Sequence, residues 1–200
     1  MVQIVSTELA KGSRTRHITS LMPDSAPILT KKDIAQRIER IAGAIREKCK
    51  MEELSLIGIH RRGVPLAERV FALLKPHYKT LLLGRVDISL YRDDLKSLEM
   101  MPKLVGSDIP FDLDNLHVIL FDEVLHTGRT ARAGLDELLD YGRPRKVELA
   151  VLIDRGGREL PIGADYVGEV VTVQPGERVS VCFEEVDGKD AVYVQKGGRR

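Results

Sequence analysis

The sequence predicts an α/β protein with a central, mostly parallel β-sheet that is flanked by helices. Three apolar runs, at 54–59, 118–121 and 147–153, have the length of strands that are buried on both faces. Each run ends in a polar loop, and the first two of these loops lead directly into a helical pattern. Strands that alternate with helices in this way favour a parallel sheet, because the helices form the crossover connections. The length of 200 residues suits one such domain.

Three helices are expected from apolar residues at helical spacing. The first begins after Thr30, a residue type that caps helix N-termini. The second covers 64–74, and the third covers 130–141 with Gly142 as its C-terminal cap. The first helix carries one apolar stripe, made of Ile34, Ile38, Ile41, Ala42 and Ile45.

The remaining strands are predicted from alternating apolar and polar residues. The run 81–91 alternates and predicts a fourth strand. Three short runs near the C-terminus, at 167–173, 179–184 and 191–194, alternate in the same way. They are expected to be terminal strands in a hairpin arrangement.

A long stretch without periodicity extends from Arg92 to Asn115. Structureless connections of this length inside a compact domain are usually lids or disordered inserts, and we interpret this one as a lid. Arg92 and the acids that follow it would then close over a charged substrate and exclude water. A solvated hairpin tip is the alternative.

The folded domain is expected to span residues 28–195. Residues 1–27 mix Ser, Thr, Pro and Gly with a few apolar positions, and we interpret them as an N-terminal extension. Residues 196–200 form a short basic tail. A solvated, flexible terminus is the simplest interpretation of both ends.

Composition restricts the class of function. The net charge of +1 lacks the positive excess that usually accompanies nucleic-acid binding. Apolar runs are too short to cross a membrane, and the N-terminus has no signal-peptide core, so a soluble protein of the reducing cytoplasm is expected. Cys49 and Cys182 lie far apart without a CxxC or histidine pattern, which suggests neither a zinc site nor a disulfide framework.

A pair of acids and a short loop follow the central apolar run. Asp122 and Glu123 stand at its C-terminal end, where open parallel sheets bind their ligands. The helix after the loop offers unpaired backbone N–H groups and the positive end of its dipole to a phosphate. We expect a sugar phosphate here, with its hydroxyls on the acids and its phosphate in the loop formed by Thr127, Gly128, Arg129 and Thr130.

The loop after the first strand is cationic and also precedes a helix. It predicts a second anion site of the same construction, formed by His60, Arg61, Arg62 and Gly63. A solvated surface turn is the alternative interpretation. The run 147–153 likewise ends in a charged turn, so three strands deliver polar loops to one edge of the sheet.

Several of these stretches resemble a known family. The strand, acid pair, TGRT loop and helix resemble the phosphoribosyl-diphosphate motif of the type I phosphoribosyltransferases. The stretches 87–95 (DISLYRDDL), 122–130 (DEVLHTGRT), 141–144 (YGRP) and 149–156 (LAVLIDRG) are similar to the PyrR family of bifunctional pyrimidine-operon attenuators and uracil phosphoribosyltransferases. The similarity runs over 28–194, and it implies a type I phosphoribosyltransferase fold with a small hood.

The resemblance implies an enzyme that converts uracil and phosphoribosyl diphosphate to UMP and pyrophosphate. Mg²⁺ would be held mainly by the substrate, and the protein would form a dimer or a higher homo-oligomer. Asp122 and Glu123 would hold the ribose hydroxyls, the TGRT loop the 5′-phosphate, and the cationic loop with Arg92 the pyrophosphate. The hood over the base would be formed by Ile153, Asp154, Arg155 and Gly156.

Three site positions depart from the family pattern. Glu123 stands where the family commonly has Asp, and Arg61 stands where it usually has Thr. His126 replaces a usual Tyr. For His126, a loop substitution without a catalytic duty and a general base both remain open.

The face that would bind RNA departs further. Family attenuators hold RNA on basic residues of the first helix and of the segment after the hood. Of these positions, Arg40 and Arg158 keep their charge. Residues that the family usually carries are replaced at Gln36, Glu39, Gly43, Gly157, Gly163 and Glu169. Each lost phosphate contact weakens RNA binding, so the alternative function, UMP-dependent attenuation, is disfavoured relative to the enzyme.

Overall fold

The computed structural model describes residues 26–50, 53–90 and 106–196. The strands are β1 (Leu54–Ile59), β2 (Leu81–Val86), β3 (His117–Leu125), β4 (Lys146–Asp154), β5 (Tyr166–Val170), β6 (Glu177–Cys182) and β7 (Ala191–Lys196). The helices are α1 (Lys31–Lys48), α2 (Gly63–Leu74), α3 (Arg129–Leu139) and α4 (Glu184–Asp187), with 3-10 turns η1 (Lys75–His77) and η2 (Ile88–Leu90).

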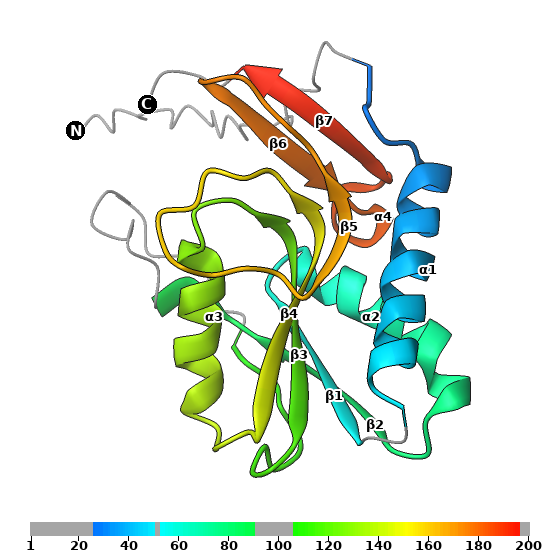
Figure 1. Ribbon diagram of the computed structural model, residues 1–200, viewed down its shortest axis with the longest axis vertical. Coiled ribbons are helices and arrows are strands. Elements are labelled where there is room, and N and C mark those ends of the chain that lie inside the picture. Colours follow the sequence, from blue (N-terminus) through cyan, green and yellow to red (C-terminus); the bar gives the residue numbers. More distant parts are fainter. Residues whose placement is uncertain (1–25, 51–52, 91–105, 197–200) are drawn as a thin grey trace, which may run out of the picture.

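Five strands form one parallel sheet in the order β2-β1-β3-β4-β5, which confirms the predicted fold class. Helices α1 and α2 cover one face of the sheet and α3 covers the other (Figure 1). The central strands are buried on both faces because both layers of helix pack on them. No helix in the described ranges is long and apolar enough to span a membrane.

Helix α1 forms where its cap and apolar stripe predict it. The side chain of Thr30 accepts a hydrogen bond from the amide of Asp33, and the carboxylate of Asp33 accepts one from the amide of Thr30. This capping box satisfies two N–H groups that the helix would otherwise leave unpaired. All five residues of the stripe are buried against the sheet and α2.

The predicted strand 81–91 is wrong in its second half, because β2 ends at Val86. The carboxylate of Asp87 accepts hydrogen bonds from the amide (2.9 Å) and the hydroxyl (2.5 Å) of Ser89. These local bonds turn the chain into η2. The residues after Val86 therefore do not continue the strand, although their alternation suggested it. The proposed lid, including Arg92, falls largely on 91–105, outside the described residues.

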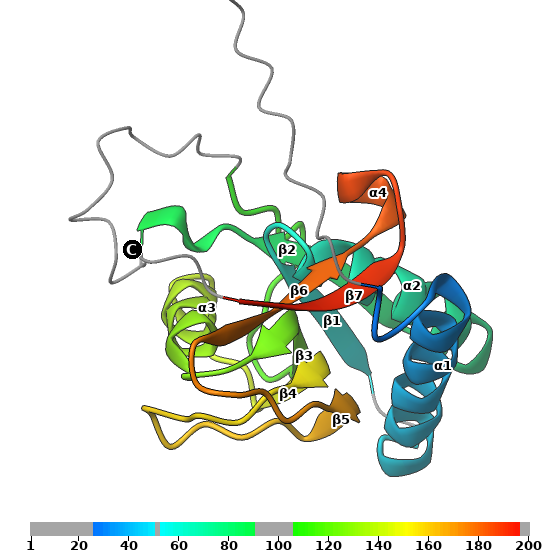
Figure 2. The ribbon, with the colours of Figure 1, turned by 90° about the horizontal axis from the view of Figure 1, so that it is seen from above.

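The C-terminal strands do not all form a hairpin. The first predicted run becomes β5, which pairs in parallel with β4 at the edge of the sheet. Only β6 and β7 form the antiparallel pair. This pair lies across the C-terminal end of the sheet (Figures 1 and 2), and the amide of Ile28 joins it by donating to the carbonyl of Val192 at 2.7 Å.

Candidate active site

The acid pair lies near the C-terminal end of β3. The side chain of Asp122 is buried, with 5% of the residue exposed, whereas Glu123 is half-buried. Burial raises the pKa of Asp122 well above its ordinary value, and the negative charge of Glu123 raises it further. The amide of Glu123 donates to Oδ1 of Asp122 at 2.9 Å, which fixes the orientation of the buried carboxyl.

The TGRT loop connects β3 to α3. Gly128 is the N-cap of α3 and has φ +91°, a conformation that favours glycine. Oγ1 of Thr127 accepts from the amide of Arg129 at 3.3 Å, and the N-cap residue Gly128 makes no side-chain hydrogen bond to the helix. Arg129 and Thr130 are exposed and begin the helix, and the positive end of the helix dipole at this terminus favours an anion. The side chain of Arg129 pairs with Glu159 at 2.8 Å.

The loop after β1 lies directly against β3. A Cβ atom on Gly63 would come within 2.2 Å of the carbonyl oxygen of Phe121, the residue before Asp122. Only glycine permits this approach, so the cationic loop and the acid pair are brought together by backbone packing. The peptide bond between His60 and Arg61 in this loop is cis.

The two arginines of this loop have different surroundings. Arg61 is exposed, whereas Arg62 forms a bidentate pair with Asp187 of α4, with Nε–Oδ2 at 2.9 Å and Nη2–Oδ1 at 2.7 Å. This hydrogen-bonded pair raises the pKa of Arg62, and the charge of Glu123 contributes to the same effect. Arg61 is thus the arginine that faces solvent, and Arg62 links the loop to the C-terminal segment.

The acidic turn around α4 is a part of the site region that sequence reasoning missed. Arg69 of α2 pairs with Glu185 at 2.7 Å and with Asp190 at 2.8 Å. Together with the pair between Arg62 and Asp187, these contacts fasten the β6–β7 connection to α2. The acidic run at 184–190 was the available signal, but its basic partners lie more than 100 residues earlier in the sequence.

The four residues predicted as the hood differ in exposure. Ile153 is fully buried in the core, whereas Asp154 and Arg155 are half-buried and Gly156 is exposed. The guanidinium of Arg155 donates to the carbonyl of Glu177 in β6 at 3.0 Å. The predicted hood lies in the turn after β4, and β4 is not the last strand of the sheet because β5 follows it. The segment that lies across this sheet end is the β6–β7 pair (Figure 2).

Arg158 is held by the protein itself. Its guanidinium donates to the carbonyl oxygens of Ile162 (2.9 Å) and His126 (3.0 Å), and it pairs with Asp154. The residue therefore ties the turn after β4 to the start of the TGRT loop. These contacts use the N–H groups through which Arg158 had been a possible RNA contact.

Two histidines border the site, and burial lowers the pKa of each. For His60 the charge of Asp87 opposes this effect in part, and Nε2 is buried without a hydrogen-bond partner among the described residues. For His126 the nearby positive charge of Arg155 adds to the effect of burial. Both rings are therefore neutral near neutral pH.

The predicted RNA face contains an internal ion pair. Glu169 of β5 accepts from Nε of Arg37 at 2.9 Å and lies 2.8 Å from its Nη2. Glu169, one of the positions that depart from the family pattern, thus neutralises an arginine of α1. Arg40 remains exposed on the same helix.

The acid pair is compatible with a bound magnesium complex. Mg²⁺ prefers oxygen ligands and is commonly held by one or two carboxylates together with substrate phosphates. Asp122 and Glu123 supply carboxylate oxygens beside a cationic loop and a helix N-terminus. The residues present therefore fit a magnesium–diphosphate group better than a fully protein-ligated ion.

Comparison with known proteins identifies the family. The model of the phosphoribosyl transferase domain matches residues 25–179. A protein named Bifunctional protein PyrR from Pelotomaculum thermopropionicum is 47% identical over 173 residues, which cover 86% of this chain and 96% of that one. A Deinococcus deserti protein of the same name is 50% identical over 169 residues, covering 84% and 92%.

Solved structures support the fold. A hypoxanthine-guanine phosphoribosyltransferase from Bacillus anthracis aligns with a TM-score of 0.62 at 16% identity, covering 84% of this chain and 96% of that chain. A hypoxanthine phosphoribosyltransferase from Trypanosoma cruzi aligns with a TM-score of 0.64 at 20% identity, covering 84% and 93%. With a type I phosphoribosyltransferase fold and relatives this similar over most of its length, the chain belongs to the PyrR family.

Proposed function

We propose that the protein is a magnesium-dependent uracil phosphoribosyltransferase that forms UMP and pyrophosphate from uracil and phosphoribosyl diphosphate. The strongest support comes from three features that meet at the C-terminal end of the sheet. They are the acid pair, the N-terminus of α3 and the cationic loop held by Gly63. Membership of the PyrR family adds the expectation of a pyrimidine base. A homo-oligomer is also expected, and its size remains a prediction.

The reaction joins a ring nitrogen of uracil to the anomeric carbon of the ribose, while the bond from that carbon to the pyrophosphate oxygen breaks. The proton of the uracil N–H group is released with the pyrophosphate. Positive charge develops on the sugar in the transition state. Asp122 and Glu123 would hold the two ring hydroxyls and stabilise this charge. The amides at the start of α3, together with Thr127 and Thr130, would hold the 5′-phosphate.

The leaving pyrophosphate would be received by the loop after β1. Arg61 is exposed there and can turn toward an anion, and the buried Nε2 of His60 offers a further hydrogen-bonding atom. Mg²⁺, when bound, would neutralise charge on the diphosphate. Ile153, Asp154, Arg155 and Gly156 remain the residues proposed to form the hood over the base, with β6 and β7 across the same end of the sheet.

The first test is turnover. Purified protein with Mg²⁺ and phosphoribosyl diphosphate is expected to convert uracil to UMP and to leave hypoxanthine unchanged, measured by chromatographic separation of the nucleotides. Omitting Mg²⁺, with chelator present, should abolish product. Conversion of hypoxanthine but not of uracil would contradict the proposed specificity. If neither base were converted, the proposed phosphoribosyltransferase activity would be wrong.

RNA-dependent attenuation is the second candidate, favoured by the relatives' name of bifunctional protein and by the exposed Arg40. We expect the wild-type chain to bind pyrimidine-operon leader RNA weakly, with or without UMP, because Arg37 and Arg158 are engaged within the protein. Salt-sensitive nanomolar retention in a filter-binding titration would reverse this preference.

Replacing Glu169 with Lys should strengthen RNA binding. The change removes a repelling carboxylate, adds a cation and releases Arg37 from its ion pair. The slope of log affinity against log salt is expected to steepen by about one unit for each additional phosphate that the protein neutralises. Glu68→Lys, which makes the same charge change at an exposed position of α2, is the control. Equal effects of the two variants would show that net charge alone is responsible.

A further inference from the structure

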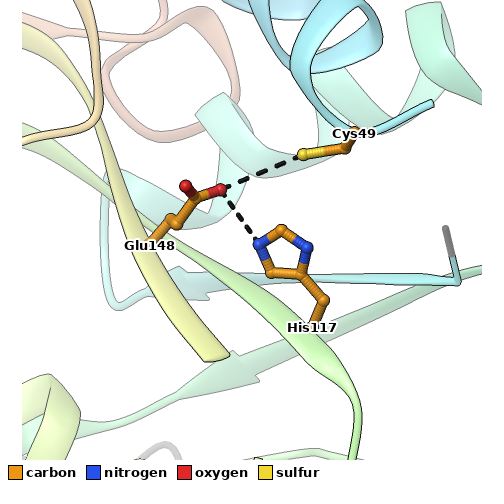
Figure 3. A group of neighbouring side chains, drawn as sticks. All are labelled: Cys49, His117 and Glu148. Atoms are coloured by element: carbon orange, nitrogen blue, oxygen red, sulfur yellow. Dashed lines mark hydrogen bonds and ion pairs between the residues drawn. The ribbon is translucent and has the colours of Figure 1, made fainter. Parts of the chain in front are cut away.

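Three side chains with metal-ligating atoms meet at the end of the sheet opposite the acid pair (Figure 3). Cys49 is the C-cap of α1, His117 is the first residue of β3, and Glu148 is near the start of β4. Each residue therefore comes from a different element. All three are buried, with 1%, 1% and 3% of the residue exposed respectively.

The ligand atoms are close enough to share one ion. Nε2 of His117 lies 2.9 Å from Oε2 of Glu148, and Sγ of Cys49 lies 3.9 Å from the same oxygen. All three atoms lie within 4.8 Å of one another. A tetrahedral zinc ion with bonds of about 2.0–2.3 Å to nitrogen, oxygen and sulfur separates its ligand atoms by about 3.3–3.8 Å. The separation between Oε2 and Nε2 is slightly shorter than that range, and the separation between Oε2 and Sγ is slightly longer.

The two oxygens of Glu148 face different groups. Oε1 lies 2.6 Å from Nζ of Lys48 and 2.7 Å from Nζ of Lys146, and both of these side chains are about half exposed to solvent. Oε2 faces His117 and Cys49, and it also accepts from the hydroxyl of Tyr166 at 2.8 Å. The lysines thus occupy one oxygen and leave the other directed at the nitrogen and sulfur ligands.

Tyr166 holds two of the ligands in place. Its hydroxyl donates to Oε2 of Glu148 at 2.8 Å and lies 3.4 Å from Sγ of Cys49. This contact fixes the carboxylate and the sulfur relative to one another.

We propose that Cys49, His117 and Glu148 form a binding site for Zn²⁺. Sulfur, nitrogen and carboxylate oxygen together suit a borderline-soft divalent ion and not Mg²⁺, which prefers oxygen ligands alone. Binding releases the thiol proton of Cys49 to solvent and requires His117 to present an unprotonated Nε2 to the metal. A bound ion would fasten the end of α1 to β3 and β4, away from the catalytic residues.

The test uses Co²⁺ as a spectroscopic substitute for Zn²⁺ on the full-length, chelator-treated protein. Titration should produce a thiolate-to-cobalt charge-transfer band that saturates at one equivalent and is bleached by Zn²⁺. Cys49→Ser should abolish the band. Cys182→Ser, which removes the other cysteine of the chain from β6, should retain it. Asp122→Asn should also retain it, because the acid pair lies at the other end of β3.

Histidine ligation is tested by a second matched pair. His117→Gln should weaken Co²⁺ binding at least tenfold, whereas His77→Gln in η1 should leave it unchanged. Absence of the band in the wild-type protein would overturn the proposal, whether or not any variant folds. A band that survives both Cys49→Ser and His117→Gln would also overturn it, since the metal would then be bound elsewhere.

Discussion

Replacing Asp122 with Asn is expected to lower kcat for UMP formation by about a hundredfold or more. The proposed role of the carboxylate is to stabilise positive charge that develops on the ribose, and an amide of the same shape lacks the negative charge. Losses of about 10²–10³ in kcat follow the removal of one preorganised electrostatic contact to a transition state. Glu123→Gln should also lower kcat. Asp136→Asn in α3 should not, because Asp136 is half-buried and pairs with Arg132 of the same helix.

The same substitution should increase stability at neutral pH. Burial raises the pKa of Asp122 in the folded state well above the value of about 3.9 expected when unfolded. Below the unfolded pKa both states are protonated, and as pH rises toward the folded pKa the unfolded state loses its proton first. Above the folded pKa the carboxyl is charged in both states, and burial of this charge then destabilises the folded state most. Asn carries no charge and therefore removes this penalty.

Steady-state kinetics and thermal unfolding measured on the same preparations separate the two effects. The expected outcome is a variant that is less active and has a higher Tm at neutral pH, with the Tm difference shrinking in acid. An Asp122→Asn protein with unchanged kcat would contradict the catalytic role. A lower Tm at neutral pH would contradict the assignment of a costly buried charge.

Replacing Gly63 with Ala is expected to destabilise the fold by about 2–3 kcal/mol, as overpacking at rigid sites does. The new Cβ would lie 2.2 Å from the carbonyl oxygen of Phe121, and its nearest neighbours are all backbone atoms of β3, so no flexible side chain can move aside. Because the clash separates the cationic loop from β3, KM for phosphoribosyl diphosphate should rise as well.

Gly43→Ala is the matched control. Gly43 lies inside α1, and a Cβ there meets nothing within 4 Å. Alanine in a helix interior is favoured over glycine by about 0.5–1 kcal/mol, so this variant should be slightly more stable than wild type. Chemical denaturation gives both values. A Gly63→Ala protein as stable as Gly43→Ala, with an unchanged KM, would mean that the close contact does not position the loop.

Local sequence patterns were sufficient where a signal is contained within one element. The capping residue Thr30 and the apolar stripe predicted α1, and unbroken apolar runs predicted β1, β3 and β4. The same patterns placed the acid pair and the TGRT loop at a strand end followed by a helix. Periodicity and capping reflect backbone geometry over a few residues, so they can be recognised without knowing the fold.

Patterns were insufficient where one signal fits two arrangements. Alternation in 167–173 suits an edge strand of a parallel sheet as well as a hairpin strand, and only packing against β4 selected the first. Likewise, alternation over 81–91 suggested a longer β2. The hydrogen bonds of Asp87 with Ser89 ended that strand, because a local polar contact competed with the sheet.

The sequence by itself determined the family, the α/β class and the chemical types gathered at the C-terminal edge of the sheet. Only the tertiary structure decided what each charged side chain contacts. Arg62 pairs with Asp187 and Arg37 with Glu169, each across more than 100 residues, while Cys49, His117 and Glu148 converge from three elements. Burial and charge pairing depend on which surfaces pack together, and that is a property of the whole fold rather than of any segment.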